Sequence, residues 1–199
     1  MPVILGETPV MTFEGYPPRK KWTREEVETF EKSGAWDGQH YELVQGDLIN
    51  KMGKHLAHIL ANKRLFLALA GAFGWDFVLP EAPFCVAPED YPTSDPEPDV
   101  IVLGRDPRGI KTTEPEADDV VLVAEVADTT LRFDLSIKAA LYARAHVPEY
   151  WVLDLRGRLV VHRDPQAGHY QSIISYSGEE RVSPLAAPDK FISVGELLG

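Results

Sequence analysis

Two acidic residues lie within or beside apolar segments of this 199-residue chain, and together they predict a reactive site. Residues 120–126 read VVLVAEV, which is typical of a strand buried on both faces, and Glu125 lies near its end. Asp99 opens a second apolar run at 100–103, directly after Pro98. Burying a carboxylate costs several kcal/mol unless it is paired or bound to a metal. The two acids therefore predict a metal-dependent hydrolytic site.

A lysine on the following helix could complete this site. Asp134 and Lys138 are four residues apart in a predicted helix over 134–145, so they share a face. Two interpretations stay open: a surface ion pair, or a lysine that extends toward acids on the sheet. A cation such as Mg²⁺ uses one or two carboxylates with water and substrate phosphate, and a nearby ammonium would stabilise developing charge.

Other reactive side chains have a structural and a functional interpretation. His55 and His58 are three apart near the start of a long predicted helix, and a solvated helix face is favoured over contact with metal or substrate. Cys85, the single cysteine, is interpreted as a small buried hydrophobe and excludes an intramolecular disulfide. Arg132 and Arg144 are either phosphate contacts or ordinary solvated charges.

The elements that must position these residues alternate between strands and helices. A capping box at Thr23 and Glu26 predicts a short helix that ends near residue 32. Gln45-Gly46 predicts a two-residue hairpin turn between strands at 41–44 and 47–49. Helices are expected at 54–73 and 134–145, a helical turn at 193–198, and further strands at 75–79, 84–86, 100–103, 120–126, 150–154, 159–162 and 170–176. This order predicts an α/β fold with a mixed β-sheet flanked by helices.

Length and composition predict one domain over 21–199, preceded by an N-terminal arm over 1–20. We expect no membrane span because no apolar stretch approaches about 20 residues. The N-terminus lacks a basic segment followed by a long apolar one, so we expect no signal peptide and, by default, a cytoplasmic location. The net charge of −11 argues mildly against a surface built for nucleic acid, although clusters matter more than totals.

The order of the candidate site residues resembles that of a known group of nucleases. An Asp, then a Glu at the end of an apolar strand, then a Lys is the skeleton of the PD-(D/E)XK nuclease superfamily. The chain is similar to the large bacterial family described as putative restriction endonucleases, which is abundant in cyanobacteria. The similarity covers most of residues 22–165, and its main stretches are YELVQGDL at 41–48, EPDVIVL at 97–103 and VAEVADTTLRFDLSIKAALYARAHVPEYWVLDL at 123–155.

This resemblance implies a restriction-endonuclease-like core and a role for each site residue. Asp99 and Glu125 would bind Mg²⁺ or Mn²⁺, and Glu42 matches an additional acid that many such nucleases hold near the metal. The lysine expected two residues after Glu125 is replaced by Ala127, and Lys138 matches the lysine that the bacterial family carries on the next helix.

Four other positions compare with the family without defining the chemistry. Gln45 stands where relatives commonly carry Asp, which changes the turn more than catalysis. Tyr142, Tyr150 and Trp151 match the family pattern, and core packing is the favoured interpretation for all three.

Three functional interpretations stay open. The favoured one is a Mg²⁺-dependent endonuclease that hydrolyses phosphodiester bonds of DNA, with a homodimer as an assembly able to cut both strands. The second is a catalytically weak or inactive module of the same fold that binds nucleic acid or protein, which the charge of −11 and Ala127 favour somewhat. The third makes Glu125 a buried structural acid paired with Lys138 or an arginine. Fold analogy alone does not decide among them.

Overall fold

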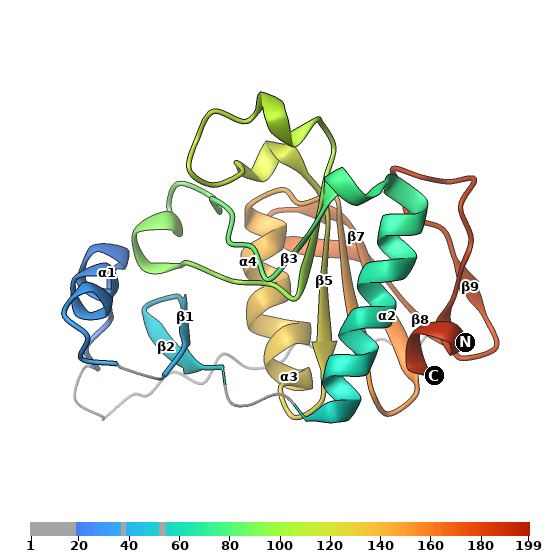
Figure 1. Ribbon diagram of the computed structural model, residues 1–199, viewed down its shortest axis with the longest axis horizontal. Helices are drawn as coiled ribbons and strands as arrows, with labels where there is room; N and C mark the ends of the chain where they lie inside the picture. The colour runs from blue at the N-terminus through green and yellow to red at the C-terminus, as the bar shows by residue number, and fades with distance from the viewer. Residues whose placement is uncertain (1–18, 37–38, 52–54) are drawn as a thin grey trace.

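The computed structural model describes residues 19–36, 39–51 and 55–199 (Figure 1). The expected N-terminal arm over 1–20 lies outside this range except for its last two residues. A six-stranded sheet in the order β3-β4-β5-β6-β7-β8 forms the centre. Helix α2 covers one face of this sheet, and α3 and α4 cover the other (Figure 1). The predicted α/β fold, with a mixed sheet flanked by helices, is confirmed.

One parallel pair makes the sheet mixed. The six strands of the sheet are β3 (Val78–Pro80), β4 (Val100–Leu103), β5 (Val120–Ala127), β6 (Glu149–Asp154), β7 (Arg158–Gln166) and β8 (His169–Ser177). Strands β5 and β6 run parallel, and every other neighbouring pair in this sheet is antiparallel. The crossover between them contains α3 (Leu131–Phe133), a π-helical turn (Asp134–Lys138) and α4 (Ala139–Arg144). The predicted strands at 120–126 and 150–154 and the helical segment between them are therefore present, and they form a strand–helix–strand unit.

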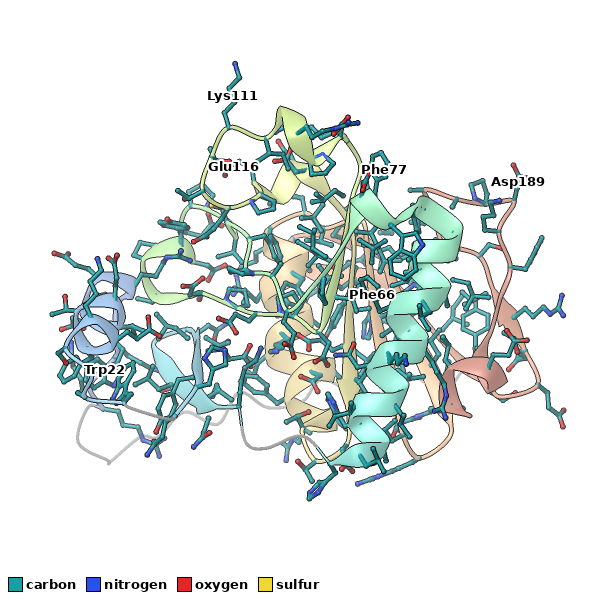
Figure 2. All side chains as sticks on the ribbon, in the orientation of Figure 1. Trp22, Phe66, Phe77, Lys111, Glu116 and Asp189 are labelled. Carbon is teal, nitrogen blue, oxygen red and sulfur yellow. The ribbon has the colours of Figure 1, made fainter. Side chains whose placement is uncertain are left out.

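Alternating side chains of the sheet fill two cores, one under each helical layer (Figure 2). On β5, Leu122, Ala124 and Val126 pack on the side of α2 (Leu56–Phe73). Val123 and Ala127 pack on the opposite side, against α4. Glu125 lies between these last two residues, so the alternation directs its carboxylate toward the crossover helix and away from α2.

A hairpin and a short helix lie beside this sheet. Helix α1 (Arg24–Lys32) starts at the predicted capping box, and β1 (Tyr41–Val44) pairs with β2 (Asp47–Asn50). The turn residues Gln45 and Gly46 have φ of 51° and 78°, as a two-residue turn with the twist of a hairpin requires. Gly46 N donates to Thr93 O at 2.7 Å, which fixes the hairpin to the long loop before β4.

Several element boundaries differ from the predictions. The expected strand at 75–79 is a 3₁₀ turn (Trp75–Phe77) followed by the short β3, and the expected strand at 84–86 is reduced to one bridge between Cys85 and Glu116. Prolines at 80, 83 and 88 lack the N–H groups that a longer ladder would need. The second helical segment starts three residues early, at Leu131. Two short strands, β9 (Arg181–Val182) and β10 (Ile192–Ser193), were not predicted, and α5 (Val194–Leu198) is the expected terminal turn.

The expectation that no segment is long and apolar enough to cross a membrane is wrong for helix α2. It passes that test by length and composition alone. Its inner face nevertheless belongs to the core of the sheet, because Leu65 and Leu69 are fully buried there. The outer face carries Leu56, Ile59 and Leu67. We therefore interpret α2 as a packed helix of the domain.

A buried histidine gives this sheet a defined response to pH. The ring of His162 on β7 packs against the rings of Tyr150 and Tyr170, with centroids 5.3 and 5.6 Å away. Burial lowers the pKa of His162 to about 4, against its ordinary value of 6.5. The folded protein therefore keeps this ring neutral at a pH where the unfolded chain binds a proton, and its stability falls as the pH drops from 6.5 toward 4.

We predict that between pH 7 and pH 5 the wild type loses about 2 kcal/mol more stability than His162→Phe, which cannot titrate. Urea denaturation at the two pH values measures the difference. The exposed His169→Phe serves as the control and should behave as the wild type does. Equal losses for the wild type and His162→Phe would contradict the prediction.

Candidate functional site

The register of β4 against β5 brings the two strand acids together. Val100 pairs with Ala124, so Asp99, one residue earlier, lies beside Glu125 near the end of β5. Asp99 N donates to Glu125 Oε2 at 3.3 Å, and Val126 N donates to Asp99 Oδ2 at 2.8 Å. Both acids are 5% exposed. Backbone hydrogen bonds therefore orient each carboxylate relative to the other strand.

Lys138 reaches the same place from the crossover helix. Its Nζ lies 2.7 Å from Glu125 Oε1 and 3.0 Å from Glu42 Oε2. The lysine side chain is 4% exposed, so the interpretation as a surface ion pair is wrong, and the extension toward the sheet is what the structure has. The structure thus brings together all four predicted site residues: Glu42, Asp99, Glu125 and Lys138.

A π-helical turn presents Lys138 to the sheet. The turn spans Asp134–Lys138, and the Ala139 N–H reaches back five residues to Asp134 O. Asp134 and Lys138 are both 3% exposed, whereas Ile137 is 39% exposed. A π turn fits one more residue into a helical turn than an α turn does, and such turns are frequent at functional sites. This turn places both ionisable residues on the inner side.

Lys138 pairs with Glu42 and Glu125, and the carboxylates of Asp99 and Asp134 lie nearby, so the described part of the site holds more acids than ammonium groups. Burial raises the pKa of Glu125 to about 8, with Asp99 and Asp134 adding to the rise and Lys138 opposing it. Burial also raises the pKa of Asp134 to about 6, again against Lys138. Burial alone would lower the pKa of Lys138, but Glu125 and Glu42 outweigh it and raise that pKa. Such a site favours the uptake of positive charge.

Three side chains that the sequence did not assign to the site also reach it. Tyr142 packs in the core as predicted, and its hydroxyl donates to Glu125 Oε1 at 3.1 Å. From α2, Asn62 Nδ2 donates to Asp99 Oδ1 at 3.4 Å, and His58 Nε2 lies 3.5 Å from Asp99 Oδ2. Figure 1 shows how: the first turns of α2 and α3 flank the end of β5.

The interpretation of His58 as part of a solvated helix face is wrong. Its side chain is 14% exposed, because it lies four residues before Asn62 and on the same side of α2. The spacing from His58 through Asn62 to the fully buried Leu65 is the signal that could have revealed this inner face. His55 is exposed, as expected.

The remaining candidates do not join the site. Arg144 is held by Asp90, with Nε to Oδ2 at 2.6 Å, so the interpretation as a freely solvated charge is wrong for this residue. Arg132 is exposed. Cys85 is only partly buried, not the fully buried residue that was expected. Burial still raises the pKa of its thiol to about 11, which makes it a poor nucleophile.

The donor set fits a hard cation that keeps part of its water. Among residues 19–36, 39–51 and 55–199, no three His, Cys, Asp or Glu side chains form a cage for a metal ion. Mg²⁺ needs no such cage, since one or two carboxylates with waters are its usual protein ligands. Asp99 and Glu125 supply these oxygens, and Asn62 Oδ1 beside them is buried without a hydrogen-bond partner. The residues therefore fit Mg²⁺ or Mn²⁺ better than a closed zinc site.

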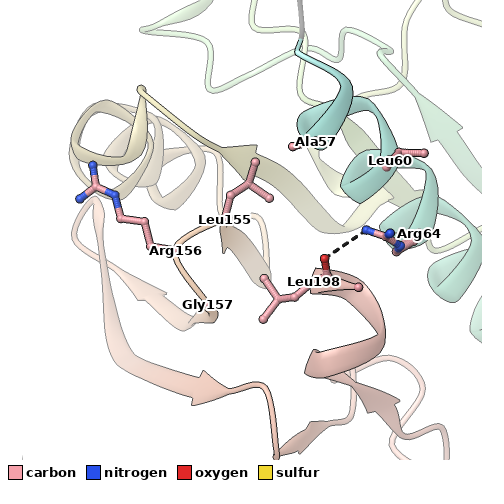
Figure 3. A pocket seen from close by; sticks show the side chains of 8 residues that line it. Ala57, Leu60, Arg64, Leu155, Arg156, Gly157 and Leu198 are labelled. Carbon is pink, nitrogen blue, oxygen red and sulfur yellow. Dashed lines mark hydrogen bonds between the residues drawn. The ribbon is translucent and has the colours of Figure 1, made fainter.

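A separate hollow lies on another face of α2 (Figure 3). It has a volume of about 420 Å³ and lies between α2, α5 and the turn after β6. Arg64 lines it at one side and donates from Nη1 to Leu198 O at 3.1 Å. None of the four predicted site residues lines it, so the hollow does not belong to the acid–lysine site.

Comparisons with known proteins agree with this fold. The family Uma2, described as putative restriction endonuclease, matches residues 25–194. The crystal structure of a putative nuclease belonging to DUF820 from Anabaena variabilis ATCC 29413 is similar, with a TM-score of 0.57 and 15% sequence identity. The similarity covers 79% of this chain and 89% of that one, and at this identity it establishes the shared fold. Among curated proteins, none matches.

We predict that Lys138→Met lowers the free energy of unfolding by about 3–5 kcal/mol, because it leaves Glu125 and Glu42 buried without their ammonium. Glu125→Gln in the Lys138→Met background should cost less than it does alone, with a coupling of about 1–3 kcal/mol. Urea denaturation of the single and double variants measures both quantities.

The matched control is Lys32→Met, which removes an exposed ion pair with Glu28 on α1. It should change stability by less than about 0.5 kcal/mol. Additive effects of the Lys138 and Glu125 substitutions on the free energy of unfolding would contradict a stabilising ion pair between these two side chains.

Proposed function

Because the chain belongs to the Uma2 family of putative restriction endonucleases, we propose that it is a Mg²⁺-dependent endonuclease that hydrolyses phosphodiester bonds of DNA. The single observation that carries this proposal is the position of Lys138. Its ammonium lies within 3.0 Å of carboxylates from the hairpin and from β5, beside Asp99 at the start of β4. Two carboxylates and a lysine at one point are the groups that metal-assisted phosphodiester hydrolysis needs.

Asp99 and Glu125 would hold the cation, which when bound lowers the pKa of a water ligand and neutralises charge on a phosphoryl oxygen. The backbone N–H groups of Asp99 and Val126 keep these two carboxylates in place. Lys138 pairs with Glu125 and Glu42, and in the working site its remaining proton would orient the attacking water and stabilise the developing negative charge. Glu42 keeps the ammonium protonated and turned toward the strand acids.

The site is more than a neutral structural ion pair. A purely structural role for Glu125 would be satisfied by Lys138 alone, giving one acid and one base. Glu42 is 5% exposed and Asp134 is 3% exposed, and both lie around the same ammonium. Extra buried acids of this kind lower stability unless they have a use, which supports a cation site.

A non-catalytic module of the same fold is the second candidate. The net charge of −11 and Ala127 in place of an in-strand lysine favour it, since phosphate affinity depends on Lys and Arg. Such a module would bind nucleic acid or protein without cutting. For the nuclease, cleavage of both strands would follow from a homodimer with two-fold symmetry.

We predict cleavage of plasmid or single-stranded DNA that requires Mg²⁺ or Mn²⁺ and stops with a chelator. Asp99→Ala, Glu125→Ala and Lys138→Ala should each lower the rate by at least about 100-fold, because each removes a charged group at the reacting centre. A gel assay on one preparation, with circular dichroism to verify folding, measures the effect.

The control is Asp118→Ala, an exposed acid outside the site, which should cut at the wild-type rate. Undiminished cleavage by Asp99→Ala or Glu125→Ala would refute the assignment. If no DNA is cut and calorimetry detects no binding of Mg²⁺ or Mn²⁺, the non-catalytic module is favoured instead.

A further inference from the structure

Helix α2 contributes two unusual polar atoms to the site. Among the described residues, only three buried side-chain nitrogen or oxygen atoms lack a hydrogen-bond partner, and they are His58 Nδ1, Asn62 Oδ1 and His162 Nδ1. Two of the three therefore belong to residues of α2 that face Asp99. A buried acceptor without a donor costs about 1–3 kcal/mol, so such atoms often mark a missing water or ion.

The orientation of the Asn62 amide places its oxygen at the site. The amide nitrogen faces Asp99 and donates to its Oδ1 at 3.4 Å, so the oxygen of the same amide lies next to this hydrogen bond, where no described residue donates to it. The reverse orientation would point the amide oxygen at a carboxylate oxygen, which electrostatic repulsion disfavours. His58, one turn earlier, approaches Asp99 from the same side of α2.

We propose that Asn62 is a further ligand of the cation site, with Oδ1 binding the divalent cation directly or through one of its waters. This inference rests on the proposed metal-dependent function and adds α2 to the elements that build its site. An amide oxygen is a hard, neutral ligand of the kind that Mg²⁺ and Mn²⁺ accept. It adds an oxygen without adding a negative charge to a place where acids already crowd.

A ligand role makes a prediction that a structural role does not. Leucine has a similar size to asparagine but has no acceptor. If Asn62 were only structural, Asn62→Leu would destabilise the metal-free protein and leave metal binding unchanged. If Oδ1 binds the cation, metal affinity falls. The metal-free melting temperature should change little, because the substitution removes both an unsatisfied buried acceptor and the long hydrogen bond from Nδ2 to Asp99.

The experiment titrates Mn²⁺ into the intact metal-free protein by calorimetry and follows the melting temperature with and without Mn²⁺. Asn62→Leu should bind Mn²⁺ about 10–100-fold more weakly than the wild type and show a smaller Mn²⁺-induced rise in melting temperature. Asn62→Asp should bind Mn²⁺ more tightly and melt lower without it, because it adds a carboxylate at the same point.

The control Gln171→Leu removes an exposed amide on β8, at the other edge of the sheet, and should bind Mn²⁺ as the wild type does. Equal Mn²⁺ affinity of the wild type and Asn62→Leu would overturn the inference and leave the proposed nuclease intact. A wild type that binds no Mn²⁺ would overturn both. Weaker binding by Asn62→Leu without any DNA cleavage would support the ligand role and count against the nuclease alone.

Discussion

The buried ion pair of Lys138 is the interaction on which the architecture of the site depends. An ammonium deep in a protein is stable only where acids surround it, and here they come from the hairpin and from β5. The hairpin is also held by Val44, which packs in the core on the α4 side of the sheet, and by backbone hydrogen bonds between Leu43 and Asp95. The ammonium and the Glu97 N–H, which donates to Glu42 Oε2 at 3.4 Å, then orient the Glu42 carboxylate. One side chain on the crossover helix thus joins three parts of the chain.

Sheet geometry supplies the other half of the site. Asp99 and Glu125 meet because β4 and β5 are antiparallel neighbours. Val100 pairs with Ala124, and this register brings the next residue on each side, Asp99 and Glu125, opposite one another. Alternation then turns Glu125 toward α4, where the π turn delivers Lys138 and Tyr142 supplies a hydroxyl. The apolar strands therefore do more than fill the core, because their pairing sets the spacing of the charged groups.

The parts of this arrangement that depend on local patterns could be predicted from the sequence. The apolar run over 120–126 indicated that Glu125 is a buried acid, and the capping box at Thr23 and the hairpin turn at Gln45-Gly46 are local signals that the structure confirms. The chain could not reveal the π turn, since one extra residue per turn leaves no signature in hydrophobic spacing. The spacing of His58, Asn62 and Leu65 does indicate an inner face of α2, but not that this face meets Asp99, because that contact depends on how the helix packs on the sheet.

The distances along the chain between the site residues have a consequence for synthesis of the protein. Asp99 and Glu125 are 26 residues apart and Lys138 follows 13 residues later, so the charged centre is no local motif. Because side chains alternate, a slip of one residue between β4 and β5 would turn the two acids to opposite faces. During synthesis, the charged residues therefore come together only after the strands of the sheet have paired in the correct register. The site forms as a result of folding.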